Sequence, residues 1–237
     1  MNVSGVLDYT IIGNDMQMVE IELDPGEGVR AEVGAMLYMT DGVDMHTSVG
    51  NGMFRGLKRM VTGESFWITT FLYNGRGKGH VAFGAPYPGK VLALDLEGGS
   101  VLCQKDAFLC AAQGIDIDVA STTKIGAGLF GGEGLIFQRL AGDGLVFVYA
   151  GGMSIELVLE PGEVLRVDPG CLVAFSPEIA YDIQCIGGFQ NALFGEEGRF
   201  LARLTGRGCV YLQSLPFSRL ADRIFATSRF PSQGSHI

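Results

Sequence analysis

Three segments of this chain carry the same motifs in the same order, and this repetition constrains the fold more than any other feature. A Leu-acidic-Pro-Gly-Glu motif occupies residues 23–27 and again 159–163, and a looser copy without the proline lies at 94–98. Because further motifs follow each copy in one shared order, the chain is predicted to contain three tandem copies of one unit. These motifs are an aspartate between large residues (Asp44, Asp116, Asp182), a phenylalanine (Phe54, Phe130, Phe194), a glutamate (Glu64, Glu133, Glu197) and a glycine-rich turn (75–77, 142–144, 206–208).

Each copy is predicted to fold as β-strands. Isoleucine and valine alternate with aspartate over residues 115–119, which is the period-two pattern of a half-buried strand. Residues 145–149 are continuously apolar, as in a strand covered on both faces. Two helices are expected, a short one over residues 56–62 and a C-terminal one over 218–226 with Ser218 as its N-cap.

These patterns predict an all-β protein with pseudo-threefold symmetry and a short C-terminal helix. The expected units are residues 1–79, 80–145 and 146–216, followed by the helix and tail at 217–237.

The charge of the chain argues against nucleic acid as a partner. The 237 residues carry a net charge of -9, which repels a phosphate backbone. The sequence shows neither a basic-then-apolar leader at its start nor an apolar run of about 20 residues, so we expect no transmembrane segment. The five cysteines include no Cys-x-x-Cys pair, and we predict a reduced, cytoplasmic protein.

The reactive side chains are predicted to serve packing rather than chemistry. Cysteines stand mostly where the other copies have alanine, valine or leucine, and a free cysteine packs as a small hydrophobe. The histidines form no His-x-His or His-x-Asp pair, so we predict no metal site, no bound cofactor and no catalytic residues. The residues concerned are Cys103, Cys110, Cys171, Cys185, Cys209, His46, His80 and His236.

The recurring aspartates Asp44, Asp116 and Asp182 allow two interpretations. A pair of carboxylates in different environments could perform acid–base catalysis. Side chains that recur once per unit more often do a repeated structural task, such as binding turn amides, and we favour that interpretation. The glycine-rich stretch 126–134 lacks the Lys-Ser/Thr that ends a phosphate-binding P-loop, so it is interpreted as a strand connection.

One small patch in the first copy is a candidate contact for a membrane or a partner protein. Lys58 and Arg59 lie there beside Leu57 and Met60, which makes the segment basic and amphipathic. A solvated surface turn is the alternative interpretation of the same residues.

Four segments together resemble a known family. They are Met-Phe-Arg-Gly-Leu-Lys-Arg at residues 53–59, Gly-Glu-Ser-Phe at 63–66, Pro-Tyr-Pro-Gly-Lys at 86–90 and Leu-Pro-Phe-Ser-Arg-Leu at 215–220. In this order they resemble the altered-inheritance-of-mitochondria family of tryptophan RNA-binding attenuation protein-like folds. The resemblance extends over residues 3–224.

The resemblance implies three shortened double-stranded β-helix units in each chain, and a homotrimer whose nine units close a ring. Eukaryotic relatives are mitochondrial and support inner-membrane organisation. Because this sequence shows no transit peptide, it is similar to the bacterial form. The family supplies no catalytic motif that could be transferred to residues of this chain.

The leading functional hypothesis is therefore a non-enzymatic, oligomeric scaffold or binding module whose ligand the sequence does not identify. One alternative is a peripheral membrane-associated organising protein that uses the patch at Leu57–Met60. An RNA-binding ring is a second alternative, and an enzyme that uses His80 or a cysteine is a third.

Overall fold

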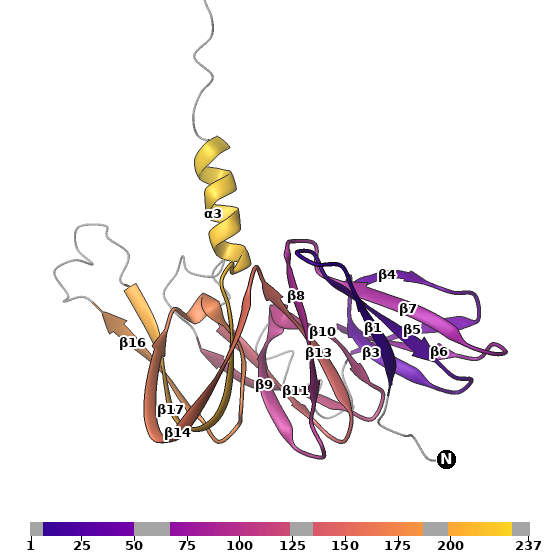
Figure 1. The fold of residues 1–237 in the computed structure, drawn as a ribbon, viewed down its shortest axis with the longest axis horizontal. Coiled ribbons are helices and arrows are strands. Elements are labelled where there is room, and N and C mark those ends of the chain that lie inside the picture. Colours follow the sequence, from indigo (N-terminus) through magenta and orange to yellow (C-terminus); the bar gives the residue numbers. More distant parts are fainter. Residues whose placement is uncertain (1–6, 50–66, 124–134, 187–198, 229–237) are drawn as a thin grey trace, which may run out of the picture.

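The computed structural model describes residues 7–49, 67–123, 135–186 and 199–228. In this part of the chain, antiparallel, curled sheets follow one another along the long axis, and one α-helix stands away from them (Figure 1). The predictions of an all-β fold and of a short C-terminal helix are confirmed.

The first sheet, sheet A, contains the strands nearest the N-terminus. Strand β2 shows why it forms, because Val19, Ile21 and Leu23 are buried while Glu20 and Glu22 face outward. The strand order is β1 (Asp8–Ile12), β2 (Met18–Leu23), β7 (Gly79–Gly84) and β4 (Met36–Met39).

Sheet B lies in the middle of the molecule. Its strand β13 is buried over residues 146–151, which agrees with the prediction of a strand covered on both faces. The order is β5 (Val43–Val49), β6 (Trp67–Tyr73), β3 (Gly28–Glu32), β10 (Phe108–Ala112), β13 (Leu145–Gly151) and β8 (Gly89–Asp95).

Sheet C contains two long strands that pair along their length. Their register shifts between Leu159 and Glu163, so the second Pro-Gly motif bends strand β14 instead of separating two strands. The order is β11 (Asp116–Thr123), β12 (Leu135–Ala141), β9 (Ser100–Gln104), β15 (Leu172–Phe175), β17 (Arg199–Gln213) and β14 (Ser154–Val167), and β16 (Ala180–Ile186) pairs with β17. Two 3₁₀ turns, η1 (Lys105–Ala107) and η3 (Pro169–Cys171), precede β10 and β15.

The core consists of two clusters of buried apolar side chains. The larger cluster joins sheets A and B and includes side chains from β9, β11 and β12 of sheet C, and the smaller one lies within sheet C around Phe137, Phe175 and Leu204. Val173 and Ala174 of β15 belong to the larger cluster although most of β15's surroundings belong to the smaller one. Strand β15 therefore connects the two cores.

The C-terminal helix α3 (Phe217–Ser228) begins one residue earlier than predicted. The carbonyl of Pro216 accepts hydrogen bonds from the amides of Arg219 (3.0 Å) and Leu220 (3.4 Å). Ser218 therefore lies inside the first turn, and the prediction that it is the N-cap is wrong. The helix predicted over residues 56–62 lies outside the described residues.

Candidate functional site

Strands distant in the sequence join edge to edge at two places. Strand β3 pairs with β10, where Ala31 lies opposite Cys110, and β9 pairs with β15, where Cys103 lies opposite Ala174. Every residue of β10 and of β15 is buried. These two strands are thus interior strands, with a partner on each side.

Strand β4 has the same local geometry as β10 and β15 but lies at the edge of sheet A. All three strands carry a β-bulge at the corresponding point, and in β4 it lies between Met36 and Tyr38. The side chains of Leu37, Tyr38 and Met39 are 53%, 41% and 38% exposed. β4 therefore presents backbone groups and large apolar side chains along an open edge.

The second half of β14 forms another open edge at the opposite end of the molecule. It pairs with β17 on one side, and it is the last strand of sheet C in the part of the chain that the structure describes. Glu163, Val164 and Arg166 are exposed, and Val167 is buried against its own sheet. We call β4 and residues 163–167 of β14 the two open edges.

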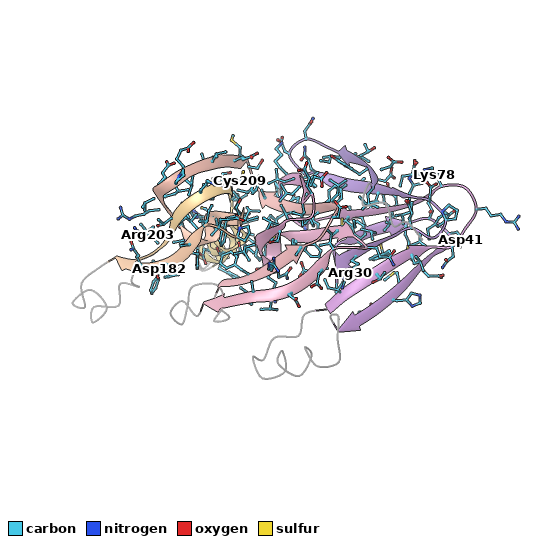
Figure 2. The ribbon with its side chains drawn as sticks, turned by 90° about the horizontal axis from the view of Figure 1, so that it is seen from below. Arg30, Asp41, Lys78, Asp182, Arg203 and Cys209 are labelled. Carbon is cyan, nitrogen blue, oxygen red and sulfur yellow. The ribbon has the colours of Figure 1, made fainter. Side chains whose placement is uncertain are left out.

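We call the β3–β10 pairing the first internal junction and the β9–β15 pairing the second. An arginine lies at the first internal junction. Arg30 of β3 is 6% exposed, and its Nη1 donates a hydrogen bond to the carbonyl of Ile115 at 2.8 Å. Figure 2 shows it within the body of the molecule. Arg166 of β14 occupies the same place in the repeated motif but is exposed at the open edge.

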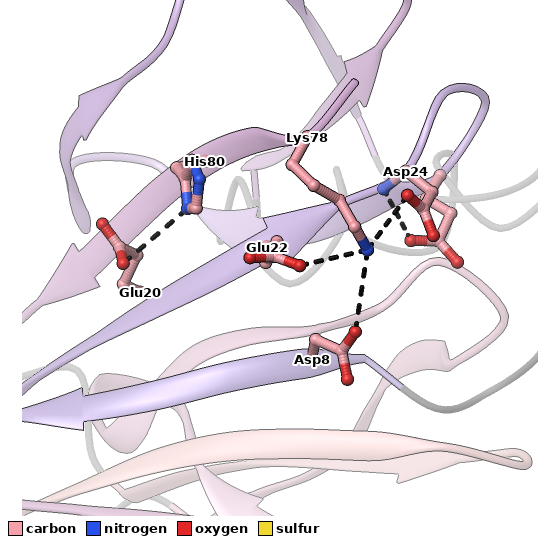
Figure 3. Close-up of polar contacts among 7 residues, drawn as sticks. Asp8, Glu20, Glu22, Asp24, Lys78 and His80 are labelled. Carbon is pink, nitrogen blue, oxygen red and sulfur yellow. Dashed lines mark hydrogen bonds and ion pairs between the residues drawn. The ribbon is translucent and has the colours of Figure 1, made fainter. Parts of the chain in front are cut away.

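A cluster of charges occupies the outer face of sheet A (Figure 3). The Nζ atom of Lys78 lies 3.0 Å from carboxylate oxygens of both Glu22 and Asp24, and 3.8 Å from one of Asp8. Hydrogen bonds to Asp24 and then Glu22 raise the pKa of Lys78 above its usual value. All four side chains are solvent-exposed to a third or more, so the cluster contributes little to stability.

A shallow hollow of about 300 Å³ lies beside this cluster, lined by Asp8, Tyr9, Thr10, Glu20, Glu22 and His80. The Nδ1 atom of His80 is 3.7 Å from Glu20, and the hydroxyl of Tyr38 donates a hydrogen bond to the other oxygen of that carboxylate. Within the described residues, no group of three or more His, Cys, Asp or Glu side chains could hold a metal ion. His80 thus lies beside the Glu20 carboxylate on a β-strand surface.

The cysteines lie in the apolar interior or partly within it. Cys103 and Cys110 are fully buried, and burial raises the pKa of each thiol well above its usual value, which suppresses the reactive thiolate. Cys171 and Cys209 are half-buried and also unpaired. The environments of Cys103 and Cys110 are those of packing residues; the side chain of Cys185 lies outside the described residues.

Glu32 is the most perturbed carboxyl group at the first internal junction. It ends strand β3, and burial raises its pKa to about 7; the negative charge of Asp106 adds to the rise and Lys105 opposes it. Desolvation disfavours the charged form of an acid, so Glu32 binds its proton more tightly in the native state.

The three recurring aspartates do not occupy one register position. In each of the three strands, one residue pairs with the large apolar residue that the neighbouring strands share (Phe71, Leu140 or Leu204). Asp44 and Asp116 lie directly before that residue, whereas Asp182 lies directly after it and opposite Arg203. Aligning Asp182 with the other two was therefore wrong by two residues. A slip of two keeps every side chain on its own face, so hydrophobic alternation cannot detect it. The register pairs are Met45↔Phe71, Ile117↔Leu140 and Tyr181↔Leu204.

The predicted contact patch at Leu57, Lys58, Arg59 and Met60 lies outside the described residues, as do Glu64, Glu133 and Glu197.

Sequence reasoning missed the two open edges and the Lys78 cluster. A signal for the first open edge was present, because residues 36–39 are all large and apolar. The Lys78 cluster has no comparable signal, since Asp8 lies on β1, Glu22 on β2 and Asp24 just after β2.

The described residues form an all-β protein with curled sheets and one short C-terminal helix. The family model for mitochondrial biogenesis AIM24 matches residues 9–215, and the chain belongs to this family. An uncharacterized protein of Streptococcus pyogenes serotype M6 is 33% identical over 216 residues, covering 87% of this chain and 85% of the relative. The crystal structure of a Streptococcus pyogenes protein has a TM-score of 0.75 and 29% identity, and covers 94% of this chain and all of that one. The family resemblance seen in the sequence is thus confirmed.

Proposed function

We propose that the protein is a non-enzymatic scaffold that assembles from identical copies through its two open edges. The observation that carries this proposal is the strand pairing at the two internal junctions. β3 and β9 are strands of one type, and they pair with β10 and β15, which are strands of a second type. One further strand of each type, the second half of β14 and β4, has an open edge among the described residues.

Strand pairing supports three equivalent units. The first comprises β2 to β7, the second β8 to β13 and the third β14 to β17. In each, the first strand pairs with the last, the second and fourth pair with the fifth, and the third pairs with the last. In the third unit the two halves of β14 act as first and second strands, and the two halves of β17 as fifth and last.

One rule describes both junctions between the proposed units. The second strand of a unit pairs with the third strand of the next, as β3 does with β10 and β9 with β15. Continuing the rule, residues 163–167 of one copy pair with β4 of a second copy. The internal registers place Tyr38 of that copy opposite Val167, because Cys110 lies opposite Ala31 and Ala174 opposite Cys103.

The side chains of β4 suit this contact. Val173 and Ala174 of β15 pack into the core of the preceding units, and the same places in β4 hold Leu37 and Tyr38. Pairing would also satisfy the open backbone groups of both edges. The contact is head-to-tail, and such contacts end in a closed ring when the rotation per copy allows it. A trimer of nine units is the ring that the family resemblance implies.

Other features support a packing role for the reactive groups. The buried cysteines have raised pKa values, and the four cysteines with described side chains are all unpaired, which favours a reducing compartment such as the cytoplasm. The described residues contain no helix long and apolar enough to cross a membrane.

Cross-linking between copies tests the proposal. A Tyr38→Cys/Val167→Cys variant should form disulfide-linked multimers under mild oxidation, and light scattering of the parent should give three times the chain mass of 25.3 kDa. A Met39→Cys/Val167→Cys variant is the control, because Met39 follows Tyr38 in the regular register beyond the bulge and points to the opposite face, so it should not cross-link. A monomeric parent, or equal cross-linking of both variants, would refute the proposed contact.

A further inference from the structure

The second strand of each proposed unit is followed or ended by a polar residue just beyond the position that pairs across the junction. At the two internal junctions these residues are Glu32 of β3 and Gln104 of β9, and at the open edge the residue is Asp168, directly after β14. Gln104 is 9% exposed and uncharged. The two carboxylates, in contrast, each need a counter-charge if a neighbouring unit covers them.

At the first internal junction this counter-charge comes from the next unit. Glu32 is half-buried and lies near η1, the turn that leads into β10. The negative charge of Asp106 in η1 opposes ionisation of Glu32, and the positive charge of Lys105 in the same turn favours it. Lys105 is therefore a counter-charge that the facing unit offers to the acid.

The open edge has no such charge on the facing copy. Residues 33–35 precede β4 as η1 precedes β10, and they contain no charged side chain. Since Tyr38 has the place of Cys110 after the bulge, Val33 has the place of Lys105. Val33 is 55% exposed. Under the proposed assembly, a valine of the second copy would therefore face Asp168.

Asp168 has its counter-charge within its own copy instead. Its Oδ2 accepts a hydrogen bond from Nη2 of Arg219, in the first turn of α3, at 2.6 Å, and its Oδ1 accepts one from the amide of Gly170 at 3.0 Å. The side chains of Arg219 and Asp168 are 51% and 45% exposed, so the pair contributes little to the stability of an isolated chain. A second copy that covers the pair would remove water from the carboxylate, and Asp168 would then depend on Arg219.

We propose that the Asp168–Arg219 ion pair belongs to the contact between copies, where Arg219 supplies the counter-charge that Lys105 supplies at the first internal junction. The inference rests on the proposed head-to-tail assembly. It extends the contact surface from the two open edges to the first turn of α3, and its partner is the turn at residues 33–35 of a second copy.

Removing the arginine tests the proposal. Arg219→Ala leaves the covered Asp168 carboxylate without its partner and should weaken assembly about tenfold, as measured by sedimentation equilibrium. Arg223→Ala removes the same charge one turn further along α3 and should assemble like the parent. If Arg219→Ala assembles as tightly as the parent, or no more weakly than Arg223→Ala, the proposal is wrong.

Two double variants separate a role in the contact from a role in anchoring α3. Asp168→Asn combined with Arg219→Ala removes the unpaired charge and retains an oxygen for the amide of Gly170, so it should restore assembly. Val33→Lys combined with Arg219→Ala places the counter-charge on the facing copy, as Lys105 does at the first internal junction, and should also restore it. Failure of Val33→Lys to restore assembly would overturn the proposal, because a second copy would not then face Asp168 at this turn.

The same measurements distinguish this inference from the assembly on which it rests. A monomeric parent would defeat head-to-tail assembly, and the role of Arg219 with it. An oligomeric parent in which Arg219→Ala has no effect would overturn the role of Arg219 alone and leave the contact between the two open edges standing.

Discussion

The inner strand β10 and the outer strand β4 occupy corresponding places in the fold but differ in what covers them. Leu109 of β10 is 3% exposed and the corresponding Leu37 of β4 is 53% exposed, although both are leucines one residue before the second bulge position. β10 has β3 on its far side, and among the described strands β4 has no further neighbour in sheet A. The comparison teaches that burial here depends on whether a further strand pairs along the far side, and not on the local sequence.

The opposite ends of the molecule show the same contrast for arginine. Figure 2 shows Arg30 inside the body, with Lys78 and Asp41 toward one end and Asp182 and Arg203 toward the other. Arg30 donates to the carbonyl of Ile115, and Arg166 is exposed. Under the proposed assembly, Arg166 donates in the same way to a second copy, at the carbonyl of Val43.

Two leucine substitutions give the largest expected effect and test the inner–outer comparison directly. Leu109→Asp places a charge in the core without a partner and should cost more than about 4 kcal/mol of unfolding free energy, enough to prevent folding. Leu37→Asp should fold with the cooperativity of the parent but remain monomeric. Thermal unfolding and light scattering measure the two properties. A Leu37→Asp protein that assembles like the parent would break the comparison.

Removing the arginines should have an intermediate effect. Arg30→Ala leaves a buried carbonyl without its donor, and we expect a loss of about 1.5–3 kcal/mol of unfolding free energy in urea. Arg166→Ala should leave the unfolding of the isolated chain unchanged and weaken assembly about tenfold, which corresponds to ~1.4 kcal/mol. Equal losses of chain stability in the two variants would show that Arg166 is not an interface residue.

Glu32 predicts a smaller, pH-dependent effect at the inner junction. Its pKa of about 7 in the native state is above its ordinary value of 4.5, so its contribution is most favourable below pH 4.5 and is lost as the pH rises through 7. Glu32→Gln should therefore raise the unfolding free energy at pH 8 by on the order of 1–3 kcal/mol and change it little at pH 4.5. A uniform shift at both pH values would indicate a packing effect instead.

The Lys78 cluster should have the smallest effect. Its side chains are exposed and screened by salt, so Lys78→Gln should leave the thermal midpoint and the oligomeric mass of the protein unchanged. A clear fall in oligomeric mass would place the outer face of sheet A in the contact between copies, which the inner–outer comparison does not expect.

Strand pattern and turn chemistry allowed much of the fold to be predicted. The alternation over 115–119 and the apolar run at 145–149 both correspond to strands, β11 and β13. Register could not be predicted, as Asp182 shows, because a two-residue slip preserves the pattern of faces. The open edges also require the strand order, since Leu37 and Leu109 have identical side chains and differ only in their neighbours.

Mixing two differently damaged copies tests the central claim most directly. Leu37→Asp disables the β4 edge, and Arg166→Asp disables the β14 edge while remaining opposite Arg203 in its own sheet. Each variant alone should have the mass of one chain. Because the proposed contact joins unlike edges, an equimolar mixture should give a dimer of twice 25.3 kDa and no larger species. A mixture that stays monomeric, or either variant dimerising alone, would contradict head-to-tail assembly.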